Sequence, residues 1–294
     1  MNTLRTVAEI RAALAPARRA GHTIGLVPTM GALHDGHLSM IRRARQDNDV
    51  VVMSLFVNPT QFSESADLDA YPRDEQRDLE LATREGVDYV FAPPVDEVYP
   101  PGFATTVTVA RLTESLEGAH RGRSHFDGVT TVVTKLFNMV GPDVAYFGQK
   151  DAQQALVIER LVRDLDIPVR IDVCPTVRER DGLALSSRNA LLSPSERDRA
   201  TALHRALSAA AGAVTAGTAD PAAVTALARA ELSADGIDPE YFELVSTDTL
   251  VPVSQIDGDV LAVVAARVGS TRLIDNQLLS TRSRLAGSTD NGGM

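Results

Sequence analysis

The feature that most constrains the fold is an alternation of short apolar runs with longer stretches of helical spacing between residues 23 and 173. The apolar, β-branched runs cover residues 23–27, 50–57, 88–92, 144–148 and 169–173. Helical stretches lie between them at 38–48, 74–85, 129–140 and 152–165. Such alternation is typical of βαβ units. We therefore predict an α/β fold with a Rossmann-like parallel sheet. Residues 129–140 are rich in β-branched side chains, but we predict a helix there because parallel strands need a crossover connection.

The pattern changes after residue 176. Ser193, Pro194 and Glu196 read as an N-cap, a first-turn proline and a capping-box glutamate, so a helix is predicted to begin there. A second helix is expected after Asp220, and strand-like runs follow at residues 241–245, 260–268 and 271–279. We predict a catalytic domain at 1–176 and a smaller α+β lid domain at 177–294 that carries the SSRN loop. The tail at 286–294 is expected to be disordered.

Composition excludes several classes of protein. Lys plus Arg is 29 and Asp plus Glu is 39, and an acidic chain of this kind is a poor general nucleic-acid binder. The single cysteine, Cys174, cannot form an internal disulfide, which fits a reducing compartment. No window approaches the roughly 18 uninterrupted apolar residues of a membrane span, and the N-terminus reads as an amphipathic helix rather than a signal peptide. We expect a cytoplasmic protein with neither a membrane nor a nucleic-acid partner.

Four polar or glycine-containing loops follow predicted strands. They read VPTMGALHDGH at 27–37, FVNPTQF at 56–62, YFGQKD at 146–151 and PTVRERDGLALSSRN at 175–189. Ligands of open parallel sheets bind beyond the carboxyl ends of the strands, where these loops would meet. The sequence therefore predicts one ligand site at that edge.

His34 and His37 in the first loop allow three interpretations. A helical zinc motif needs i,i+4 spacing and a third ligand, whereas these histidines are three apart and have no third ligand nearby in sequence. Capping or a solvated pair is the ordinary alternative. A phosphate site is the third, because a helix N-terminus attracts anions, imidazoles can donate to phosphate, and Gly31 and Gly36 allow close approach of the backbone.

Lys150 favours the phosphate interpretation. Asp151 beside it could simply cap the next helix, with Gln154 at the third helical position. That reading does not explain a lysine at the positive end of a helix, which is unfavourable without an anion. Two hydroxyls and a guanidinium suited to phosphate follow in the last loop, at Ser186, Ser187 and Arg188. The basic run HRGRSH at 120–125 is either a solvated surface loop or an anion clamp.

The motifs PTMGALHDGH, FVNPTQF, DAYPR, FGQKDAQQ and PTVRERDGLALSSRN occur here in the order and spacing of one known family. The chain resembles the pantothenate synthetase (pantoate–β-alanine ligase) family of the HxGH nucleotidyltransferase superfamily, over nearly its whole length and including LIDN near the C-terminus. The resemblance implies condensation of (R)-pantoate with β-alanine through a pantoyl adenylate, with Mg-ATP consumed and pyrophosphate and AMP released. It also implies a homodimer. HxGH alone would leave another adenylyl- or cytidylyltransferase as the alternative.

The resemblance assigns residues motif by motif. The catalytic set it implies is His37, His34, Lys150, Ser186, Ser187 and Arg188. The ATP-binding set is Met30, Gly31, Ala32, Leu33, His34, Asp35, Gly36, His37, Gly148, Gln149, Lys150, Asp151, Val177, Leu185, Ser186, Ser187 and Arg188. Gln61 and Gln154 are implied as pantoate ligands, with Gln61 also near β-alanine.

Some assignments stay open at this point. Asn58 and Tyr71 are expected in the same region, and Asp78 is a candidate outer partner for magnesium, whose direct ligands are unassigned. Gln149 stands where family members often carry glutamate. The loop from 117 to 125 is one residue longer than the family pattern, so either Arg121 or Arg123 could occupy the usual arginine place.

The chemistry of the implied reaction limits what these side chains must do. Pantoate's carboxylate is already ionised at neutral pH, so adenylation needs alignment and charge neutralisation rather than a base. The second step needs the neutral amine of β-alanine, and the motifs contain no evident strong base. Whether His34 or His37 transfers a proton remains an open question.

Overall fold

The structure is a computed structural model that describes residues 1–62, 68–69 and 71–281. The chain divides into two compact units, Met1–Ala190 and Leu191–Met294. The tail predicted to be disordered lies outside the described residues. Each unit is treated by itself below.

The first unit is built on a six-stranded parallel sheet, which confirms the predicted α/β class. The strands run in the order β1-β4-β3-β2-β5-β6, so the chain reverses its direction of winding between β2 and β5. Such a reversal is where open sheets bind ligands. Their bounds are β1 Asn2–Leu4, β2 Ile24–Thr29, β3 Val50–Leu55, β4 Tyr89–Phe91, β5 Val144–Gly148 and β6 Arg170–Cys174. The three-residue edge strand β1 was not predicted.

Helices and short 3-10 turns connect the strands of this unit. The helices are α1 Val7–Arg19, α2 Asp35–Asp47, α4 Glu75–Arg84, α5 Val95–Val98, α6 Glu117–Arg121, α7 Arg123–Val140 and α8 Ala152–Asp164, and the turns are η1 Pro59–Gln61, η2 Gln149–Asp151 and η3 Ser187–Leu191. The β-branched stretch at 129–140 is helical, as predicted. Helix α2 starts earlier than predicted, at Asp35, because His34 caps it. Across the described residues, no helix is long and apolar enough to cross a membrane.

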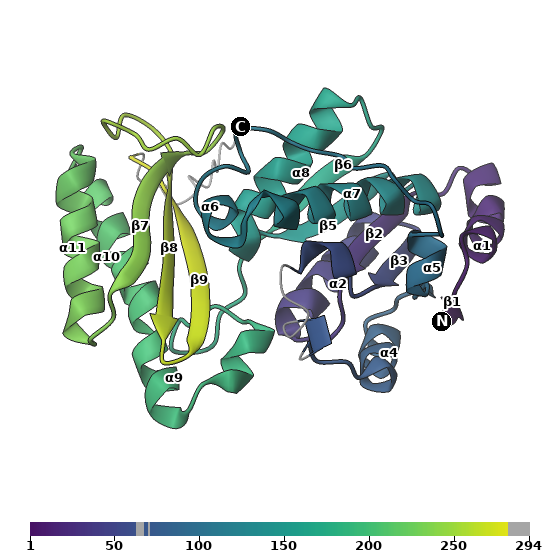
Figure 1. Cartoon of the computed structure of the whole chain (residues 1–294), viewed down its shortest axis with the longest axis horizontal. Coiled ribbons are helices and arrows are strands. Elements are labelled where there is room, and N and C mark those ends of the chain that lie inside the picture. The colour runs from purple at the N-terminus through teal and green to yellow at the C-terminus, as the bar shows by residue number, and fades with distance from the viewer. Residues whose placement is uncertain (63–67, 70, 282–294) are drawn as a thin grey trace, which may run out of the picture. The chain divides into compact units, whose positions relative to one another are not determined.

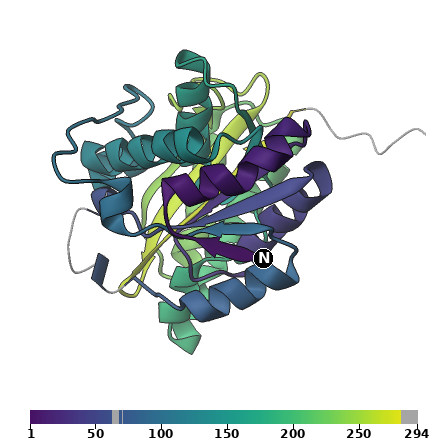
Figure 2. The same ribbon diagram turned by 90° about the vertical axis from the view of Figure 1, so that its right-hand side faces the viewer.

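Both faces of the sheet are covered by helices. Alternate residues of β2 point to opposite faces, with Ile24 and Leu26 in one core cluster and Val27 in the other. The first cluster contains buried residues of α1, α7 and α8, and the second contains those of α2 and α4. Figure 2 shows α1 and α7 on one side of the strands and α4 on the other. The site loops are therefore carried by a sheet that is packed on both faces.

The amino edge of the sheet is capped by three aspartates. Each accepts a backbone N–H at or near the start of a strand: Asp49 from Thr23 at 2.8 Å, Asp88 from Val51 at 2.8 Å and Asp143 from Ile24 at 2.7 Å. Because these N–H groups lie at strand ends, a neighbouring side chain is needed to pair them. The carboxylates on this edge are therefore used to hold the fold.

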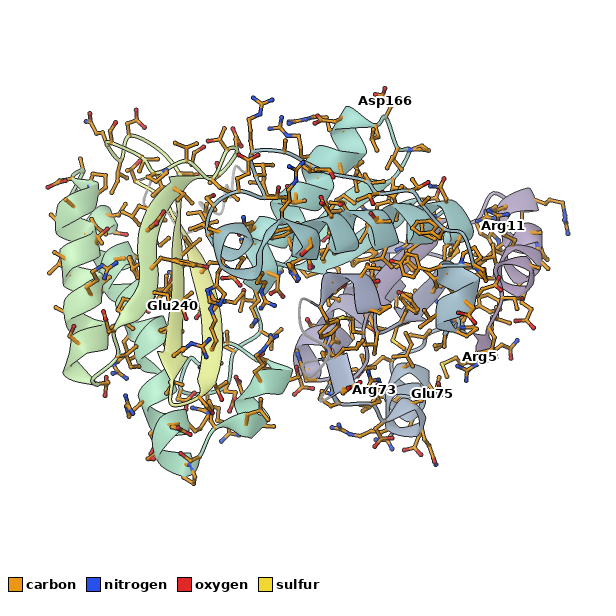
Figure 3. All side chains as sticks on the ribbon, viewed as in Figure 1. Arg5, Arg11, Arg73, Glu75, Asp166 and Glu240 are labelled. Carbon is orange, nitrogen blue, oxygen red and sulfur yellow. The ribbon has the colours of Figure 1, made fainter. Side chains whose placement is uncertain are left out.

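Helix α4 is tied to the edge of the sheet by an ion pair. Arg5, which precedes α1, donates from Nη1 to Glu75 Oε2 at 3.0 Å and to the Ala92 carbonyl at 3.1 Å. Both Arg5 and Glu75 are labelled in Figure 3. This contact fixes the first turn of α4, whose buried residue Asp78 reaches the site loops.

The second unit is a three-stranded antiparallel sheet with helices, which agrees with the predicted α+β class. Its elements are α9 Pro194–Ala200, α10 Ala202–Thr215, α11 Pro221–Ala234, β7 Pro239–Ser246, β8 Val260–Val268 and β9 Thr271–Leu279. Helix α10 packs on β8 and β9, and α11 packs on β7 (Figure 1). The capping box of Ser193 and Glu196 is present. The predicted single helix from Ser193 is two helices, because the helix ends at Thr201 and restarts.

The units divide later than the predicted domain boundary at 176. The backbone N–H of Leu185 donates to Val177 O at 3.0 Å. The Asn189 amide donates to Ala184 O at 3.1 Å. These bonds tie the SSRN loop to the segment that follows β6, so the loop belongs to the first unit rather than to the second.

Candidate active site

The first site loop ends where His34 caps helix α2. His34 Nδ1 accepts from the Gly36 N–H at 3.1 Å, and His37 Nδ1 accepts from the His34 N–H at 3.3 Å. The two side chains thus form a reciprocal capping box, and their ring centroids lie 4.1 Å apart. Capping, one of the three interpretations of this pair, is therefore present in the fold. It does not exclude ligand binding, since each imidazole has a second nitrogen.

These caps determine which ring nitrogen carries hydrogen. A backbone N–H can only donate, so the accepting Nδ1 of His34 and of His37 must hold a lone pair. In the neutral ring the hydrogen then resides on Nε2. Both imidazoles are consequently set as Nε2–H donors.

Burial keeps the two rings neutral. It is the main cause that lowers the pKa of His37 to about 3, and the nearby His34 lowers it further. Burial also lowers the pKa of His34, followed by the positive charge of Lys150. Lys150 acts on both rings, so η2 and the start of α2 lie close together.

Lys150 lies in η2, immediately before helix α8. Its Nζ is 3.8 Å from Asp151 Oδ1, and its side chain is mostly buried. Asp151 occupies the N-cap position of α8, but its side chain makes no capping hydrogen bond there. The alternative that Asp151 and Gln154 form a capping box is therefore not observed. A lysine and a half-exposed aspartate remain at a helix N-terminus, where an anion is favoured.

The last site loop adds a guanidinium to this cluster. Desolvation lowers the pKa of Arg188, and the positive charge of Arg121 lowers it further. Arg121 Nε donates to Glu117 Oε2 at 3.0 Å, whereas Arg123 is exposed and lies 3.9 Å from Asp127. The structure thus places Arg121, and not Arg123, beside the SSRN loop.

Gln153 holds the segment from which Arg121 projects. Its side-chain amide accepts from the Glu117 N–H at 2.9 Å and donates to Leu112 O and Ser115 O at 2.7 and 2.9 Å. Gly118 is required here, because a Cβ would lie 1.9 Å from Thr113 O. Gln153 lies in the motif FGQKDAQQ but has no predicted role, since a buried amide that bonds only to backbone has no local signature.

The second site loop is fixed by a network of neutral groups around Asn58. The buried Asn58 amide donates to Gln61 Oε1 at 3.1 Å and to Gly128 O at 3.1 Å, and its Oδ1 accepts from Tyr99 at 2.8 Å. Gln61 Nε2 in turn donates to Met30 Sδ at 3.1 Å. The amide orientation of Gln61 is therefore defined, and this loop contacts the first.

His125 and Tyr71 connect the remaining loops. The His125 ring lies 2.7 Å from Gln61 O through Nδ1, and burial lowers its pKa. Burial raises the pKa of Tyr71, which lies near enough to Arg188, Asp78 and Asp151 for their charges to act on it. His125 ends the basic run HRGRSH, and Tyr71 lies in the family motif DAYPR.

The remaining predicted residues lie on the same loops. Gln154 is half-buried in the first turn of α8, and Ser186 Oγ accepts from the Arg188 N–H at 3.3 Å. Gly148 is not sterically required, since a Cβ there would be 3.8 Å from Met40 Sδ. Their contacts agree with one site at the carboxyl edge, but no bound molecule tests the individual roles.

Metal ligands were sought among the same residues. Across the described part of the chain, no three His, Cys, Asp or Glu side chains come together as a set that could hold a metal ion. Both oxygens of Asp78 are used by backbone N–H groups, from Ala32 and Leu33. The described side chains therefore do not form a protein-built metal site.

Comparison with known proteins identifies the family. The profile of the family described as pantoate–β-alanine ligase matches residues 2–278. A pantothenate synthetase of Moorella thermoacetica is 56% identical over 280 residues, which cover 95% of this chain and 99% of that protein. A pantothenate synthetase of Cereibacter sphaeroides is 55% identical, with 93% of this chain and 98% of that protein covered.

Solved structures agree with the sequence relatives. The pantothenate synthetase of Thermus thermophilus superimposes with a TM-score of 0.90 at 47% identity and covers 96% of this chain and 100% of its own. The pantoate–β-alanine ligase of Francisella tularensis, solved in complex with an ATP compound and β-alanine, has a TM-score of 0.79 at 33% identity, over 95% of this chain and 97% of its own. The chain belongs to the pantoate–β-alanine ligase family and is an ATP-dependent ligase.

Proposed function

We propose that the clustered donors activate pantoate by transferring AMP from ATP to its carboxylate. One observation carries this assignment. Two imidazoles, each held through Nδ1 so that Nε2–H is free to donate, lie with Lys150 and Arg188 on loops at the edge where the strand order reverses. Asp151 and Glu117 already lie beside these cations, and a bound polyanion would give all of these donors a further partner. A triphosphate supplies that anion, and its α-phosphate would lie at the start of α2.

The proposed role of His34 and His37 is to donate hydrogen bonds without transferring a proton. Nδ1 of each ring is occupied by a backbone N–H, and Nε2 already carries hydrogen. Neither ring is therefore available as a base, and burial opposes protonation of either one. Adenylation of an ionised carboxylate needs no proton transfer, so two neutral donors aimed at developing phosphate charge suit the step.

Lys150, Ser186, Ser187 and Arg188 are proposed to neutralise the α-phosphate and the departing pyrophosphate. Arg121 joins them in this proposal, because its neighbour Glu117 orients it and its charge already acts on Arg188. The nucleotide contacts otherwise follow the predicted backbone positions at residues 30–37, 148–151, 177 and 185–188.

Gln61 and Gln154 are proposed to bind pantoate. An amide both donates and accepts, which suits a substrate with two hydroxyl groups. Asn58 supports this role for Gln61, because its bond to Oε1 leaves the Gln61 Nε2 directed toward Met30 in the first loop. Substitution of either glutamine by alanine should raise the KM for pantoate more than the KM for ATP.

In the second step, the amine of β-alanine attacks the acyl carbon of the adenylate and AMP leaves. We propose that the site binds or generates the neutral amine and contains no dedicated base. The single-turnover rate of this step should then rise with pH toward the pKa of the amine. A substitution that abolishes only this step would contradict the proposal.

Magnesium is proposed to enter as part of the Mg-ATP substrate. The ion would be held by phosphate oxygens and water, which is its usual arrangement in nucleotide sites. No protein ligand is assigned to it here.

We also propose that the protein is a homodimer and is located in the cytoplasm. These proposals rest on family resemblance and on composition. Sedimentation equilibrium of the full chain would measure the mass in solution, and a monomer at micromolar concentration would contradict the dimer.

Pyrophosphate exchange tests the proposed activity. With labelled pyrophosphate, ATP should become labelled only when pantoate is present, and added β-alanine should convert the system to AMP and pantothenate. Exchange without pantoate, or with nucleotide acceptors instead, would favour the alternative of another HxGH transferase. An absence of exchange with every acid would exclude a catalytic role.

A further inference from the structure

The turn between β2 and α2 has an unusual backbone. Gly31 has φ of +87° and Ala32 has φ of +51°, so two successive residues occupy the left-handed region. Glycine tolerates that region, but alanine has a Cβ and does so at a cost in free energy. The turn therefore needs support from outside its own sequence. It directly precedes His34, whose capping geometry defines the site.

Asp78 supplies this support. Its Oδ2 accepts from the Ala32 N–H at 2.9 Å, and its Oδ1 accepts from the Leu33 N–H at 2.8 Å. The side chain is only 1% exposed. Successive N–H groups in such a turn form a concave anion site, and here the carboxylate of the protein itself occupies it.

The contact between the turn and the carboxylate is close on every side. A Cβ on Gly31 would lie 2.8 Å from Asp78 Oδ2 and 2.9 Å from Leu55 Cδ1. The same turn of α4 is also linked through Glu75 to Arg5, which bonds to the Ala92 carbonyl just after β4. The turn is thus fixed between β3 and α4.

We propose that Asp78 is a positioning residue that sets the Gly31–Ala32 turn, and through it the direction of the His34 and His37 Nε2–H groups. Both of its oxygens already accept backbone N–H groups, so the place of Asp78 in the fold is explained without a magnesium ion. The proposal rests on the proposed function, since the phosphate is the group toward which these imidazoles would be directed. It replaces the candidate role of Asp78 as an outer partner of the metal.

Asp78→Asn tests the assignment with little change in shape. An amide cannot accept two N–H bonds through both of its terminal atoms, so one bond is lost and two donors face each other. We expect kcat for pantoate-dependent exchange to fall by about ten- to a hundredfold, as for a lost hydrogen bond to a charged group. The Mg²⁺ concentration for half-maximal exchange should stay within about twofold of the wild-type value, since the substitution would remove no ligand of the ion. Glu80→Gln removes an exposed carboxylate from the same helix and should alter neither quantity.

Histidine side-chain ¹⁵N NMR gives a readout that does not depend on activity. In the wild type, His34 and His37 should show unprotonated Nδ1 and protonated Nε2. In Asp78→Asn, the His34 signals should move toward a mixture of tautomers, while Glu80→Gln leaves them unchanged. If the wild type lacked pantoate-dependent exchange, the proposed function would fail, yet these spectra would still test Asp78.

Two results would overturn the proposal. If excess Mg²⁺ restored kcat in Asp78→Asn, the carboxylate would be a metal partner. If Asp78→Asn matched Glu80→Gln in both exchange and spectra, Asp78 would have no positioning role. Should Asp78→Asn fail to fold, Gly31→Ala displaces the turn while keeping the carboxylate, and wild-type exchange and His34 signals in that variant would contradict the proposal equally.

Discussion

The two edges of the six-stranded sheet use charged and polar residues in opposite ways. At the amino edge, Asp49, Asp88 and Asp143 each accept a backbone N–H from the start of a strand. At the carboxyl edge, cations lie close to one another and to imidazoles: Lys150 helps to lower the pKa of His34 and of His37, and Arg121 helps to lower the pKa of Arg188. One edge pairs carboxylates with backbone N–H groups, whereas the other gathers several side-chain cations together with Asp151 and Glu117.

This difference separates stability from function. Charges that are paired with backbone groups stabilise the fold, and their loss leaves an N–H without its partner. Several cations that lie together, even with Asp151 and Glu117 beside them, favour the binding of a further anion. Asp78 shows that the position of a residue does not by itself reveal its role. It lies near the carboxyl edge, yet it accepts backbone N–H groups as the aspartates of the amino edge do.

The largest expected effect is loss of a cation from the carboxyl edge. Lys150→Ala should lower kcat for pantoate-dependent exchange by about 10²–10³-fold, the usual result of removing one preorganised donor to transition-state charge. Its free energy of unfolding should stay within about 1 kcal/mol of the wild-type value, since the ion pair that Lys150 makes is with the half-exposed Asp151 at 3.8 Å. Urea titration measures the second quantity, and a large loss of stability would show that Lys150 belongs with the structural charges.

An anion should stabilise the protein through the same edge. Inorganic pyrophosphate at about 100 times its Kd should raise the free energy of unfolding by about 2.7 kcal/mol. Thermal unfolding with and without pyrophosphate measures the shift. Lys150→Ala should lose most of it at the same concentration, and Asp88→Ala should keep it. Equal shifts in both variants would mean that pyrophosphate binds elsewhere.

Removal of an amino-edge carboxylate should lower stability and leave activity unchanged, the reverse of the result expected for Lys150→Ala. Asp88 accepts from the Val51 N–H at 2.8 Å and from Arg45 at 2.7 Å. Asp88→Ala should lower the free energy of unfolding by about 1–3 kcal/mol, because a strand N–H loses its partner. Activity per folded molecule should be unchanged, which active-site titration combined with exchange can measure. A fall in kcat would show that the two edges are coupled.

A further prediction concerns the pH dependence of stability. The pKa of His37 is lowered to about 3 in the fold, so between pH 6.5 and 3 the unfolded chain binds the additional proton. His37 therefore contributes stability that is fully present above pH 6.5 and is lost as the pH falls toward 3, with a slope of about 1.4 kcal/mol per pH unit. The difference between wild type and His37→Gln in urea titrations from pH 8 to 4 isolates this slope. A difference that does not vary with pH would show that His37 titrates normally and could transfer a proton.

Much of the first unit was predicted correctly because its strands and helices are marked by patterns of consecutive residues. The strands β2, β3 and β5 are apolar runs buried on both faces, and α8 has continuous helical spacing. The edge strand β1 has only three residues, so no periodicity can appear, and pairing with β4 alone defines it. The early start of α2 depended on His34 acting as a cap, which histidine seldom does by residue type.

The family motifs likewise identified the loops of the site but not what holds them. Gln153 lies in the motif FGQKDAQQ and Asp78 is a candidate metal partner by resemblance, but their bonds to backbone groups far away in the chain leave no local sign of a structural role. The choice between Arg121 and Arg123 also required the fold, since only Arg121 lies where its charge reaches Arg188.

The sequence by itself determined the α/β class, the family and the loops that carry the chemistry, because apolar periodicity and motif spacing are properties of consecutive residues. Only the tertiary structure decided the neutral Nε2–H state of His34 and His37, the pairing of Asp78 with the Gly31–Ala32 turn, and the inclusion of the SSRN loop in the first unit. The physical reason is that protonation and hydrogen-bond pairing depend on burial and on the direction of neighbouring donors, which the chain acquires only when distant segments pack together.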